Sequence, residues 1–516
     1  MDNVIVEMGL EAPWTLAFGA AAVALPLVGL AVFGKELYLS YKCRHIPCGE
    51  PPLPILGHAL TLMKGNVFRT FMEWSRKHGD LVRFHAFGTV YILCNNPQDC
   101  KRVLSTNIKS YKKDPSTYTV FSCLLGNGLI TSEGDRWHAI RRKLAPVFKL
   151  EILGDVGSAA GMVTRLLFKE LDKAAETGEE IDLAEHLRRV TLQVISVAVL
   201  GISPEESEQE VSNLYLPIID ECNDRIWYPQ RIYLPTPAWW QHWSKIRQLN
   251  SYIEGKVRKR WASFREEQKN GQEGKKGSRT ILDSIFAGMD EPVQFGSKEV
   301  LALRDEIKSF LFAGHDTTSC MITWAFWEMM KNKSIMDKVL EEANGLFPKP
   351  DSDPSFDQLR SALPYTFNVL RESLRTRSPV PVIPRECLKS DVLSGREIPK
   401  GAVVVVNMDT IHKTAEFWPG DDVLAFRPDR FGKVETTSPQ TGLGEGVDQW
   451  AFLPFINGPR NCLGQHFSLL EARVVTALLV QRYDFTPAPG QDDTPHPYKI
   501  PITPITGMKC IVKRRK

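Results

Sequence analysis

The residues with the clearest chemical potential lie near the C-terminal end of the 516-residue chain, where Phe455 to Gly464 read FINGPRNCLG. A buried cysteine usually behaves as a small apolar residue. Here Cys462 directly precedes a predicted long apolar helix, and Gly458 and Gly464 allow the backbone to approach a flat ligand closely. The start of that helix and the nearby Arg460 both favour the thiolate over the thiol. The segment therefore predicts a thiolate ligand for iron at Cys462.

A second segment, Ala313 to Thr318, lies inside a stretch whose apolar residues recur at helical spacing. Positions 313, 317 and 320 share one helix face, and Gly314 thins the helix beside it. The hydroxyl of Thr317 can bond to the carbonyl oxygen four residues earlier and bend the helix, and this structural role fits the sequence as well as a catalytic one does. We expect His315 to pack or to form hydrogen bonds rather than to bind a metal.

Charged side chains at helical spacing mark two more segments. Glu372 and Arg375 are three residues apart, which in most proteins gives a surface pair worth about 0.2–0.5 kcal/mol. Trp137 and Arg141 are four residues apart and therefore share a helix face. Arg385 follows a proline, and an arginine can bind a carboxylate in a forked geometry.

In chain order these segments resemble the motifs of the cytochrome P450 family of haem-thiolate enzymes. The ligand loop of that family reads F-x-x-G-x-R-x-C-x-G, and residues 455–464 match all five fixed positions. The resemblance covers roughly residues 46 to 512. It implies a fold that is mainly α with a minor β-sheet region, the cytochrome P450 fold, preceded by an N-terminal transmembrane helix.

The resemblance also implies roles for individual residues. Cys462 is expected to be the axial ligand of the iron of haem b. The haem is expected to be bound non-covalently, because Ala313 stands where some fatty-acid ω-hydroxylases carry a glutamate that esterifies the haem. Asp316 and Thr317 are the expected catalytic pair that relays protons. The residues expected to bind the cofactor, with the basic ones on its propionates, are Trp137, Arg141, Ala313, Gly314, Arg385, Phe455, Arg460, Cys462 and Gly464. A mostly buried ion network is expected to support the cysteine loop and to comprise Glu372, Arg375 and Arg430.

The activity implied by the family is monooxygenation, in which one atom of O2 enters an apolar substrate. Electrons would come from NADPH–cytochrome P450 reductase, with cytochrome b5 as a second candidate donor. Arg142 and Lys143 are either solvated surface or part of a basic patch that docks such a donor. Two alternatives stay open: an isomerase or dehydratase acting on a lipid hydroperoxide, and a non-catalytic haem protein. The motif around Ala313 to Thr318 looks most similar to the clan that contains fatty-acid ω-hydroxylases.

The N-terminus predicts a membrane anchor. Residues from Ala12 to Gly34 carry no charge and are long enough to cross a bilayer as a helix. Acidic residues precede this stretch and basic residues follow it, which favours a single-pass topology with the remainder in the cytosol. A cleaved signal or transit peptide is disfavoured, because its start should be basic rather than acidic. The resemblance to microsomal members of the family places the anchor in the endoplasmic reticulum membrane.

Three regions follow from these expectations: residues 1–35 as the anchor, 36–57 as a proline-rich hinge, and 58–516 as the haem-thiolate monooxygenase domain. The prolines between Ile46 and Pro54 should prevent helix and sheet hydrogen bonding and give a stiff, extended connector. Residues 269–279 are rich in Lys, Gly and Gln and predict a surface connector.

The remaining periodicities predict mostly helices. Apolar spacing indicates helices at 181–200, 297–330 and 465–483, and strands at 81–94, 402–408 and 510–513. The aromatic-rich segment 214–243 fits a cap over an apolar pocket, a membrane contact or a plain core helix.

Composition excludes several classes of protein. With 64 basic and 61 acidic side chains the net charge is +3, which gives no basic field for nucleic acid. The ten cysteines are scattered, which favours reduced thiols over a disulfide framework. Cys43, His45 and Cys48 are the tightest cluster in sequence, but they lack the second ligand pair typical of structural zinc.

Overall fold

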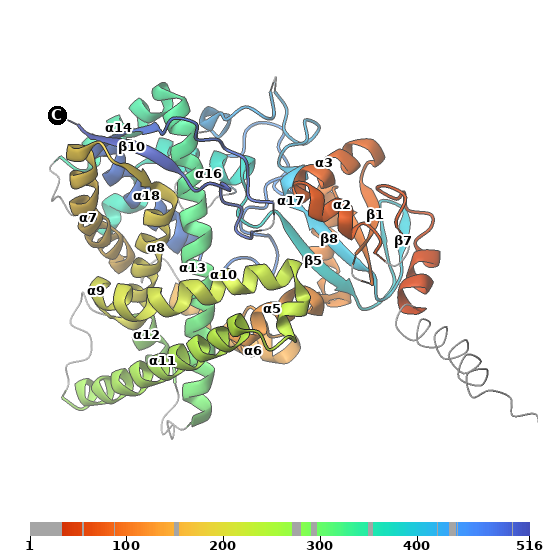
Figure 1. Cartoon of the computed structure of the whole chain (residues 1–516), viewed down its shortest axis with the longest axis horizontal. Coiled ribbons are helices and arrows are strands. Elements are labelled where there is room, and N and C mark those ends of the chain that lie inside the picture. Colours follow the sequence, from red (N-terminus) through yellow and green to blue (C-terminus); the bar gives the residue numbers. More distant parts are fainter. Residues whose placement is uncertain are drawn as a thin grey trace, which may run out of the picture.

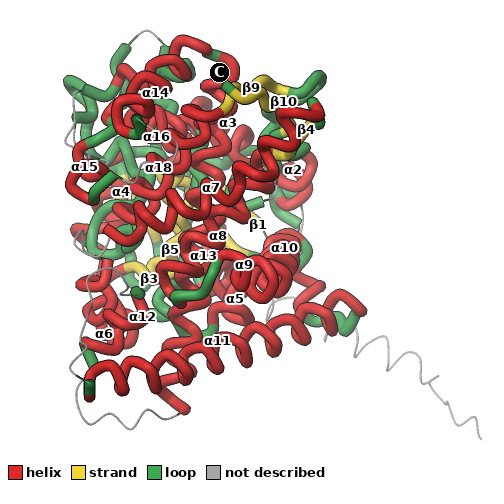
Figure 2. Tube along the Cα trace, turned by 90° about the vertical axis from the view of Figure 1, so that its left-hand side faces the viewer, coloured by secondary structure: helices red, strands yellow, loops and turns green. Residues whose placement is uncertain are grey.

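The computed structural model describes residues 34–515 apart from 54–55, 87, 149–153, 271–279, 290–296, 349–353, 421, 433–439, 441 and 498. The described chain is mainly helical with small sheets, as predicted (Figures 1 and 2). A short helix covers 34–42. The α-helices in the first half of the chain are Ala59–Lys64 (α2), Val67–His78 (α3), Pro97–Lys101 (α4), Pro115–Leu125 (α5), Gly134–Leu144 (α6), Gly154–Thr177 (α7), Leu183–Leu200 (α8), Pro204–Glu206 (α9), Asn213–Trp227 (α10) and Pro237–Lys269 (α11). The second half contains Ile281–Ala287 (α12), Ser297–Lys331 (α13), Lys333–Leu346 (α14), Phe356–Ser361 (α15), Pro364–Thr376 (α16), Met408–Ile411 (α17) and Gln465–Arg482 (α18).

The strands form one larger sheet and two small ones. They are Leu81–Ala86 (β1), Thr89–Cys94 (β2), Tyr111–Lys113 (β3), Glu180–Asp182 (β4), Val382–Cys387 (β5), Asp391–Leu393 (β6), Arg396–Ile398 (β7), Val403–Asn407 (β8), Tyr483–Pro487 (β9) and Lys509–Arg514 (β10). The larger sheet has the order β1-β2-β8-β5-β3, and only the β2–β8 pair in it is parallel. A second sheet has the order β4-β10-β9, and β6 pairs with β7. The larger sheet lies to one side of the helical body (Figure 1).

The predicted elements are present, with shifted ends. The helix expected from Ile181 begins at Leu183, because Glu180–Asp182 pair with β10 and the Asp182 carboxylate caps the helix by accepting from the Ala184 amide at 3.0 Å. The strand predicted across 81–94 is a hairpin of β1 and β2, with Gly88 at a positive φ of 72° in its turn. The long apolar helix after Cys462 ends at Arg482, and Tyr483 begins β9.

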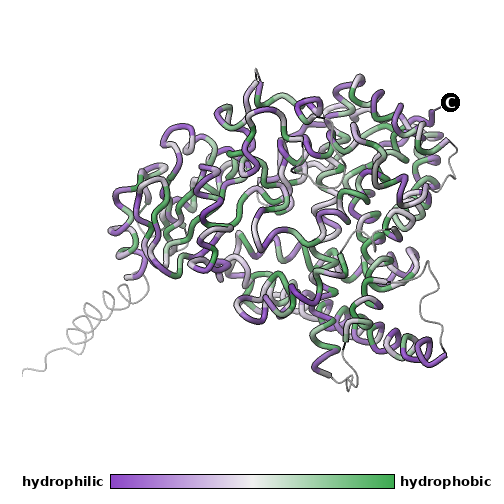
Figure 3. The backbone as a smooth tube through the Cα atoms, turned by 180° about the vertical axis from the view of Figure 1, so that it is seen from behind, coloured by the Kyte–Doolittle hydropathy of each residue, from purple (hydrophilic) through white to green (hydrophobic). Residues whose placement is uncertain are grey.

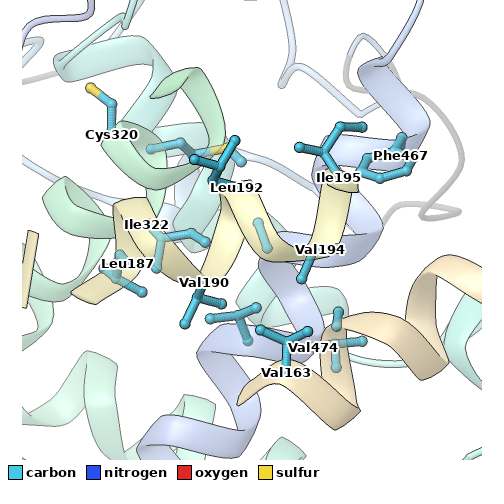
Figure 4. Close-up of a cluster of buried hydrophobic side chains, with 14 of the residues drawn as sticks. Val163, Leu187, Val190, Leu192, Val194, Ile195, Cys320, Ile322, Phe467 and Val474 are labelled. Atoms are coloured by element: carbon cyan, nitrogen blue, oxygen red, sulfur yellow. The ribbon is translucent and has the colours of Figure 1, made fainter. Parts of the chain in front are cut away.

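The central pair of the helical body is α8 against α13. A Cβ on Gly314 of α13 would lie 2.9 Å from Ile195 of α8, so this glycine allows the two helices to approach closely. Figure 4 shows the apolar layer that results, with α8 side chains such as Val190 and Ile195 between residues of α7, α13 and α18. The helix that carries Thr317 is therefore packed within the apolar core of the helical body.

The N-terminal part of the described chain is attached to the larger sheet. The Pro47 carbonyl accepts from the Arg83 amide at 2.7 Å, and the Gly49 amide donates to the Arg83 carbonyl at 3.0 Å. The expectation that prolines prevent sheet hydrogen bonds here was wrong, because these bonds use a proline carbonyl and a glycine amide and need no proline N–H. Residues 34–42 are helical, so the extended part of the expected hinge begins after them.

Residues 1–33 of the predicted anchor and residues 271–279 of the predicted connector lie outside the described residues, and α11 continues to Lys269, where the connector was expected to begin. In the part that is described, no single helix has the length and apolar composition to cross a membrane. Leu183–Leu200 and Pro204–Trp227 meet those criteria only together, across a bend of 116°.

The aromatic-rich segment divides into a buried and an exposed part. Ile218, Ile219 and Cys222 of α10 are fully buried, as in a core helix. After α10, Tyr233 and Leu234 are exposed, and so is Trp240 near the start of α11. Figure 3 shows that hydrophobic segments concentrate inside the helical body, whereas the far end of α11 is hydrophilic.

Candidate functional site

Cys462 lies in a tight loop immediately before α18. Its amide donates to the Phe455 carbonyl at 2.8 Å, and the Asn461 amide donates to the Gly458 carbonyl at 3.1 Å. Gly458 has a φ of 86°, and a Cβ there would lie 2.4 Å from the Leu104 carbonyl oxygen, so no other residue fits this position. Ile456 also has a positive φ, of 59°, which is costly for a branched side chain. The loop is therefore fixed by hydrogen bonds and by packing.

Cys462 is half-buried, and its surroundings act in opposite directions on the pKa of its thiol. Burial raises the pKa of Cys462, while a hydrogen bond with the Gly464 backbone and the charge of Arg141 lower it by less. The cation that lowers the pKa of Cys462 is thus Arg141. The sequence had predicted Arg460 for this role. A metal must displace the proton to bind the sulfur, so metal binding and proton release are coupled at this position.

Gly464 fits the close approach of a flat ligand. Its φ of −90° is accessible to any residue, and no protein atom lies within 4 Å of where its Cβ would be. Neither backbone strain nor packing within the described chain therefore requires a glycine here. Phe455, at the other end of the loop, is buried.

Three cations gather beside this loop. The Arg460 guanidinium holds the Glu133 carboxylate in a forked pair, with N–O distances of 2.5 and 2.6 Å, and lies 5.0 Å from the ring centroid of Trp137. Lys113 of β3 is buried and donates to two carbonyl oxygens of the loop before α6. Arg385 pairs with Lys113 across β3 and β5 and is also buried.

Positive charge exceeds negative charge in this cluster. Burial, together with the charges of Arg460 and Arg385, lowers the pKa of Lys113 to about 7 against the attraction of Glu133. Burial also raises the pKa of Glu306 to about 7, so this carboxyl compensates little. Two carboxylates of a ligand would balance the charge, which is what the propionates of a haem would supply. The chemistry of these residues therefore fits that group.

Arg141 does not contact the same carboxylate. Its Nη1 donates to the Asn461 carbonyl at 3.0 Å and its Nη2 to the Asn461 side-chain oxygen at 2.6 Å. Helix α6 thus attaches directly to the residue before Cys462. On the same helix, Trp137 is buried, whereas Arg142 and Lys143 are exposed.

The predicted face of α13 is present in the structure. Ala313 is exposed although it lies in the middle of α13, where the neighbouring Leu311 and His315 are buried, and Thr317 is half-buried one turn further on. The Thr317 hydroxyl donates to the Ala313 carbonyl at 2.8 Å. Thr318, on the adjacent face, is hydrogen-bonded to Ser468 of α18 at 2.9 Å, which fixes α13 against the helix that follows Cys462.

Asp316 is buried and lies in an ion pair rather than beside the Thr317 hydroxyl. Its Oδ1 accepts from Arg188 Nε of α8 at 2.9 Å, and His315 Nε2 lies 3.0 Å from the same oxygen. Burial would raise the pKa of Asp316, but the charge of Arg188 and the nearby His315 outweigh it and hold the pKa well below its ordinary value. The other end of Arg188 reaches Asp220 at 3.1 Å, whose side chain is half exposed to solvent.

Glu372, Arg375 and Arg430 lie together. Arg375 binds both oxygens of Glu372 at 2.8 Å, and Arg430 Nε reaches the same carboxylate at 3.1 Å. The Arg427 amide is a further donor, at 2.8 Å. The remaining donors of Arg375 reach the carbonyls of three residues between α17 and the cysteine loop, namely His412, Val423 and Ala425.

Sequence reasoning missed several partners of these residues. Glu133 directly precedes α6, but the helix dipole alone favours an acid at that position, so Glu133 gave no signal for a nearby cation. The sequence near Arg188 and Lys113 did not predict that they belong to the site, because contacts between distant segments bring them there. Gly314 serves the packing of α8 on α13, and its contact with a cofactor remains a prediction.

Comparisons with known proteins agree with this geometry. A family model described as cytochrome P450 matches residues 47–510. Similar chains include Cytochrome P450 4c21 of Blattella germanica, which is 26% identical over 96% of this chain and 99% of its own. Cytokinin hydroxylase of Arabidopsis thaliana is 28% identical over 86% of this chain and 82% of its own. Cytochrome P450 4B1 of Rattus norvegicus is 26% identical over 94% of this chain and 93% of its own.

Proposed function

The chain belongs to the cytochrome P450 family of monooxygenases, and we propose that it is a membrane-bound member that inserts one atom of O2 into an apolar substrate. The observation that carries this proposal is the half-buried Cys462 in its fixed loop, next to buried cations in excess over acids. We assign residues 58–516 to the monooxygenase domain, 1–35 to the anchor and 36–57 to the hinge between them.

The residues proposed to hold haem b surround that loop. Cys462 would bind the iron, and Arg141, Arg385 and Arg460 would face the propionates beside Trp137. Ala313 provides no carboxylate on the exposed face of α13, so the haem would be held without an ester bond. When bound, a haem with a thiolate ligand supplies the electron density that favours cleavage of the O–O bond.

Thr317 and Asp316 are proposed to deliver protons on the face of α13 that carries Ala313. The Thr317 hydroxyl donates to the Ala313 carbonyl, and a change of rotamer would free its proton for the substrate side. Asp316, Arg188 and Asp220 form a charged chain from the buried helix to the surface. When its bond to Arg188 opens, the Asp316 carboxylate can accept a proton from solvent, which reaches the other end of this chain at the half-exposed Asp220.

A membrane location fits the exposed apolar residues. Tyr228, Tyr233, Leu234 and Trp240 lie in the segment that joins α10 to α11 and in the first turn of α11, and all are exposed. Tyr and Trp are favoured at membrane interfaces. We propose a single-pass protein of the endoplasmic reticulum whose catalytic domain faces the cytosol and takes an apolar, membrane-soluble substrate.

Arg142 and Lys143 are proposed to form part of the docking surface for the electron donor. Both are exposed on α6, whose Arg141 is bonded to the residue before Cys462. The bond from α6 to the residue before Cys462 supports this proposal, because exposed basic side chains near that loop would attract an acidic partner. The proposed donors are NADPH–cytochrome P450 reductase and cytochrome b5.

The test of the proposal is Cys462→Ser in the full-length protein. The ferrous carbon monoxide complex of the wild type should show the long-wavelength Soret band of a thiolate ligand, and the variant should lose it. Cys510→Ser, a buried cysteine on β10, is the matched control and should keep the band. An unchanged band in Cys462→Ser would overturn the assignment, and turnover of a lipid hydroperoxide without reductase would favour an isomerase instead.

A further inference from the structure

A second group of metal-binding side chains lies away from the cysteine loop, where three helices meet. Cys123 of α5, Cys222 of α10 and His242 of α11 bring their ligand atoms within 4.8 Å of one another. Within the described residues no other trio of His, Cys, Asp or Glu side chains meets this criterion. In Figure 1, α5 lies at one end of α10, and α10 and α11 run beside each other.

The distance between the sulfur of Cys123 and the ring nitrogen of His242 matches a tetrahedral zinc site. Cys123 Sγ lies 3.5 Å from His242 Nε2. With zinc–sulfur bonds of about 2.3 Å and zinc–nitrogen bonds of about 2.0–2.1 Å, tetrahedral angles place the two ligand atoms about 3.5 Å apart. The two sulfurs of such a site would be somewhat further apart, which the 4.8 Å limit allows.

The surroundings also suit a metal held by two thiolates. Cys222 and His242 are buried, and only Cys123 is half exposed. His242 Nδ1 is buried without a hydrogen-bond partner among the described residues, so hydrogen bonding does not fix the ring in a tautomer that blocks Nε2. Arg225 Nη1 approaches Cys123 Sγ at 4.0 Å, as the N–H donors around metal thiolates do.

Charge balance is compatible with the ion. Arg225 is buried, and Lys308 of α13 lies close enough to Cys123 to interact with it electrostatically. Two thiolates cancel the charge of one Zn2+, so these cations would face a neutral centre. Sulfur and imidazole together prefer zinc over the hard cations magnesium and calcium.

We propose that Cys123, Cys222 and His242 bind one zinc ion, which joins α5, α10 and α11. Three protein ligands leave a fourth position for water, and the half-exposed Cys123 is the ligand nearest solvent. The ion would also fix α5 in place over α13, because Phe121 of α5 packs on Phe312 of α13 at 5.0 Å between ring centroids. Phe312 directly precedes Ala313, so the zinc would stiffen the wall beside the face that carries Thr317. The inference rests on these three side chains and not on the proposed oxygen chemistry.

The test measures zinc and iron in full-length, haem-loaded protein kept reduced with a phosphine, after equilibration with ZnCl2 and removal of loosely bound metal. We expect about one zinc per haem iron in the wild type. Cys222→Ser and His242→Ala should lower this ratio about tenfold or more, while Cys510→Ser should not change it. The carbon monoxide band of each variant verifies that it is folded. X-ray absorption at the zinc edge should show sulfur at about 2.3 Å and nitrogen at about 2.0 Å.

Three results would overturn the site. The first is reduced wild-type protein with no zinc above trace after incubation. The second is a zinc content that Cys222→Ser and His242→Ala leave unchanged, since the ion would then be bound elsewhere. The third is a Cys123–Cys222 disulfide in protein alkylated at lysis, which would assign these sulfurs to redox chemistry. As a second readout, chelation should lower the melting temperature of the wild type and leave that of Cys222→Ser unchanged.

Discussion

Two buried ion networks of this molecule use the same side-chain types and differ in their connections. The network on α16 is closed, because the Glu372 carboxylate receives four donors and the side chains of Glu372 and Arg375 are 0% exposed. The network on α13 is open. Asp316 is buried, but Arg188 continues to Asp220, whose side chain is 48% exposed.

The comparison teaches which network can rearrange. The Glu372 carboxylate is held by four donors at once, so the opening of one hydrogen bond does not release it. Asp316 depends mainly on one guanidinium that already has an alternative partner at the surface. We therefore regard the α16 network as a fixed support for the segment before the cysteine loop, and the α13 network as a route by which charge can reach a buried helix.

The largest effect should come from breaking the closed network. Glu372→Gln leaves Arg375 buried without its counter-charge and should lower the free energy of unfolding by about 3–5 kcal/mol. Urea unfolding followed by circular dichroism measures this. Glu73→Gln is the matched control, because Glu73 pairs with Arg69 on the surface, and its loss should cost no more than about 0.5 kcal/mol. Equal losses in the two variants would refute the contrast between buried and surface pairs.

A smaller effect is expected from the open network. Arg188→Leu should cost about 2 kcal/mol at neutral pH, less than Glu372→Gln, because Asp316 can bind a proton once its guanidinium is gone. Asp220→Asn, at the exposed end, should change the stability by about 0.5 kcal/mol or less. Equal costs for Arg188→Leu and Glu372→Gln would show that the α13 network is as closed as the other.

The pH dependence of the stability tests the contribution of Asp316 to the α13 network. The folded-state pKa of Asp316 lies below its unfolded value, so the unfolded chain binds the proton more tightly. The stabilisation by Arg188 is therefore complete above the unfolded value of about 3.9 and is lost as the pH falls toward the folded value. Unfolding between about pH 6 and pH 3 should show a steeper loss of stability in the wild type than in Asp316→Asn. If the stability of both proteins fell equally with pH, Asp316 would not be the group whose protonation destabilises the wild type.

A small effect on stability, with a large effect on function, is expected for Thr317→Ala. Losing the hydrogen bond to the Ala313 carbonyl should cost about 1 kcal/mol or less. The carbon monoxide band should remain, while more of the NADPH consumed with reductase should end as peroxide instead of product. Product and peroxide are quantified per NADPH. Fully coupled turnover in this variant would contradict a role for the hydroxyl in proton delivery.

Local sequence patterns predicted the elements that carry the chemistry. They did not predict the contacts between residues that are distant in the sequence. The helix of Thr317 and the loop of Cys462 were predictable because periodicity and glycine spacing are properties of neighbouring residues. Strands of three residues such as β3 and β4 were missed, since they exist only through partners that are distant in the sequence. For the same reason the sequence indicated neither Glu133 as the partner of Arg460 nor Arg188 as that of Asp316.

The cysteines show the same limit. The cluster that is tightest in sequence contains Cys43, His45 and Cys48, whereas the side chains that converge in space come from three separate helices. Nothing within a short window could have related Cys123 to Cys222 or His242. Proximity in the chain was a poor guide to proximity of sulfur and imidazole.

The attachment of residues 47–58 to β1 has a consequence for shortened forms of the protein. Pro47 and Gly49 satisfy the outward backbone groups of Arg83, while the His58 amide and ring nitrogen satisfy those of His85. Removing residues 1–50 to obtain a more soluble fragment would leave the backbone N–H and C=O groups of Arg83 on the edge of β1 unpaired. Exposed sheet edges pair with strands of other molecules, so such a fragment should self-associate unless this edge is blocked.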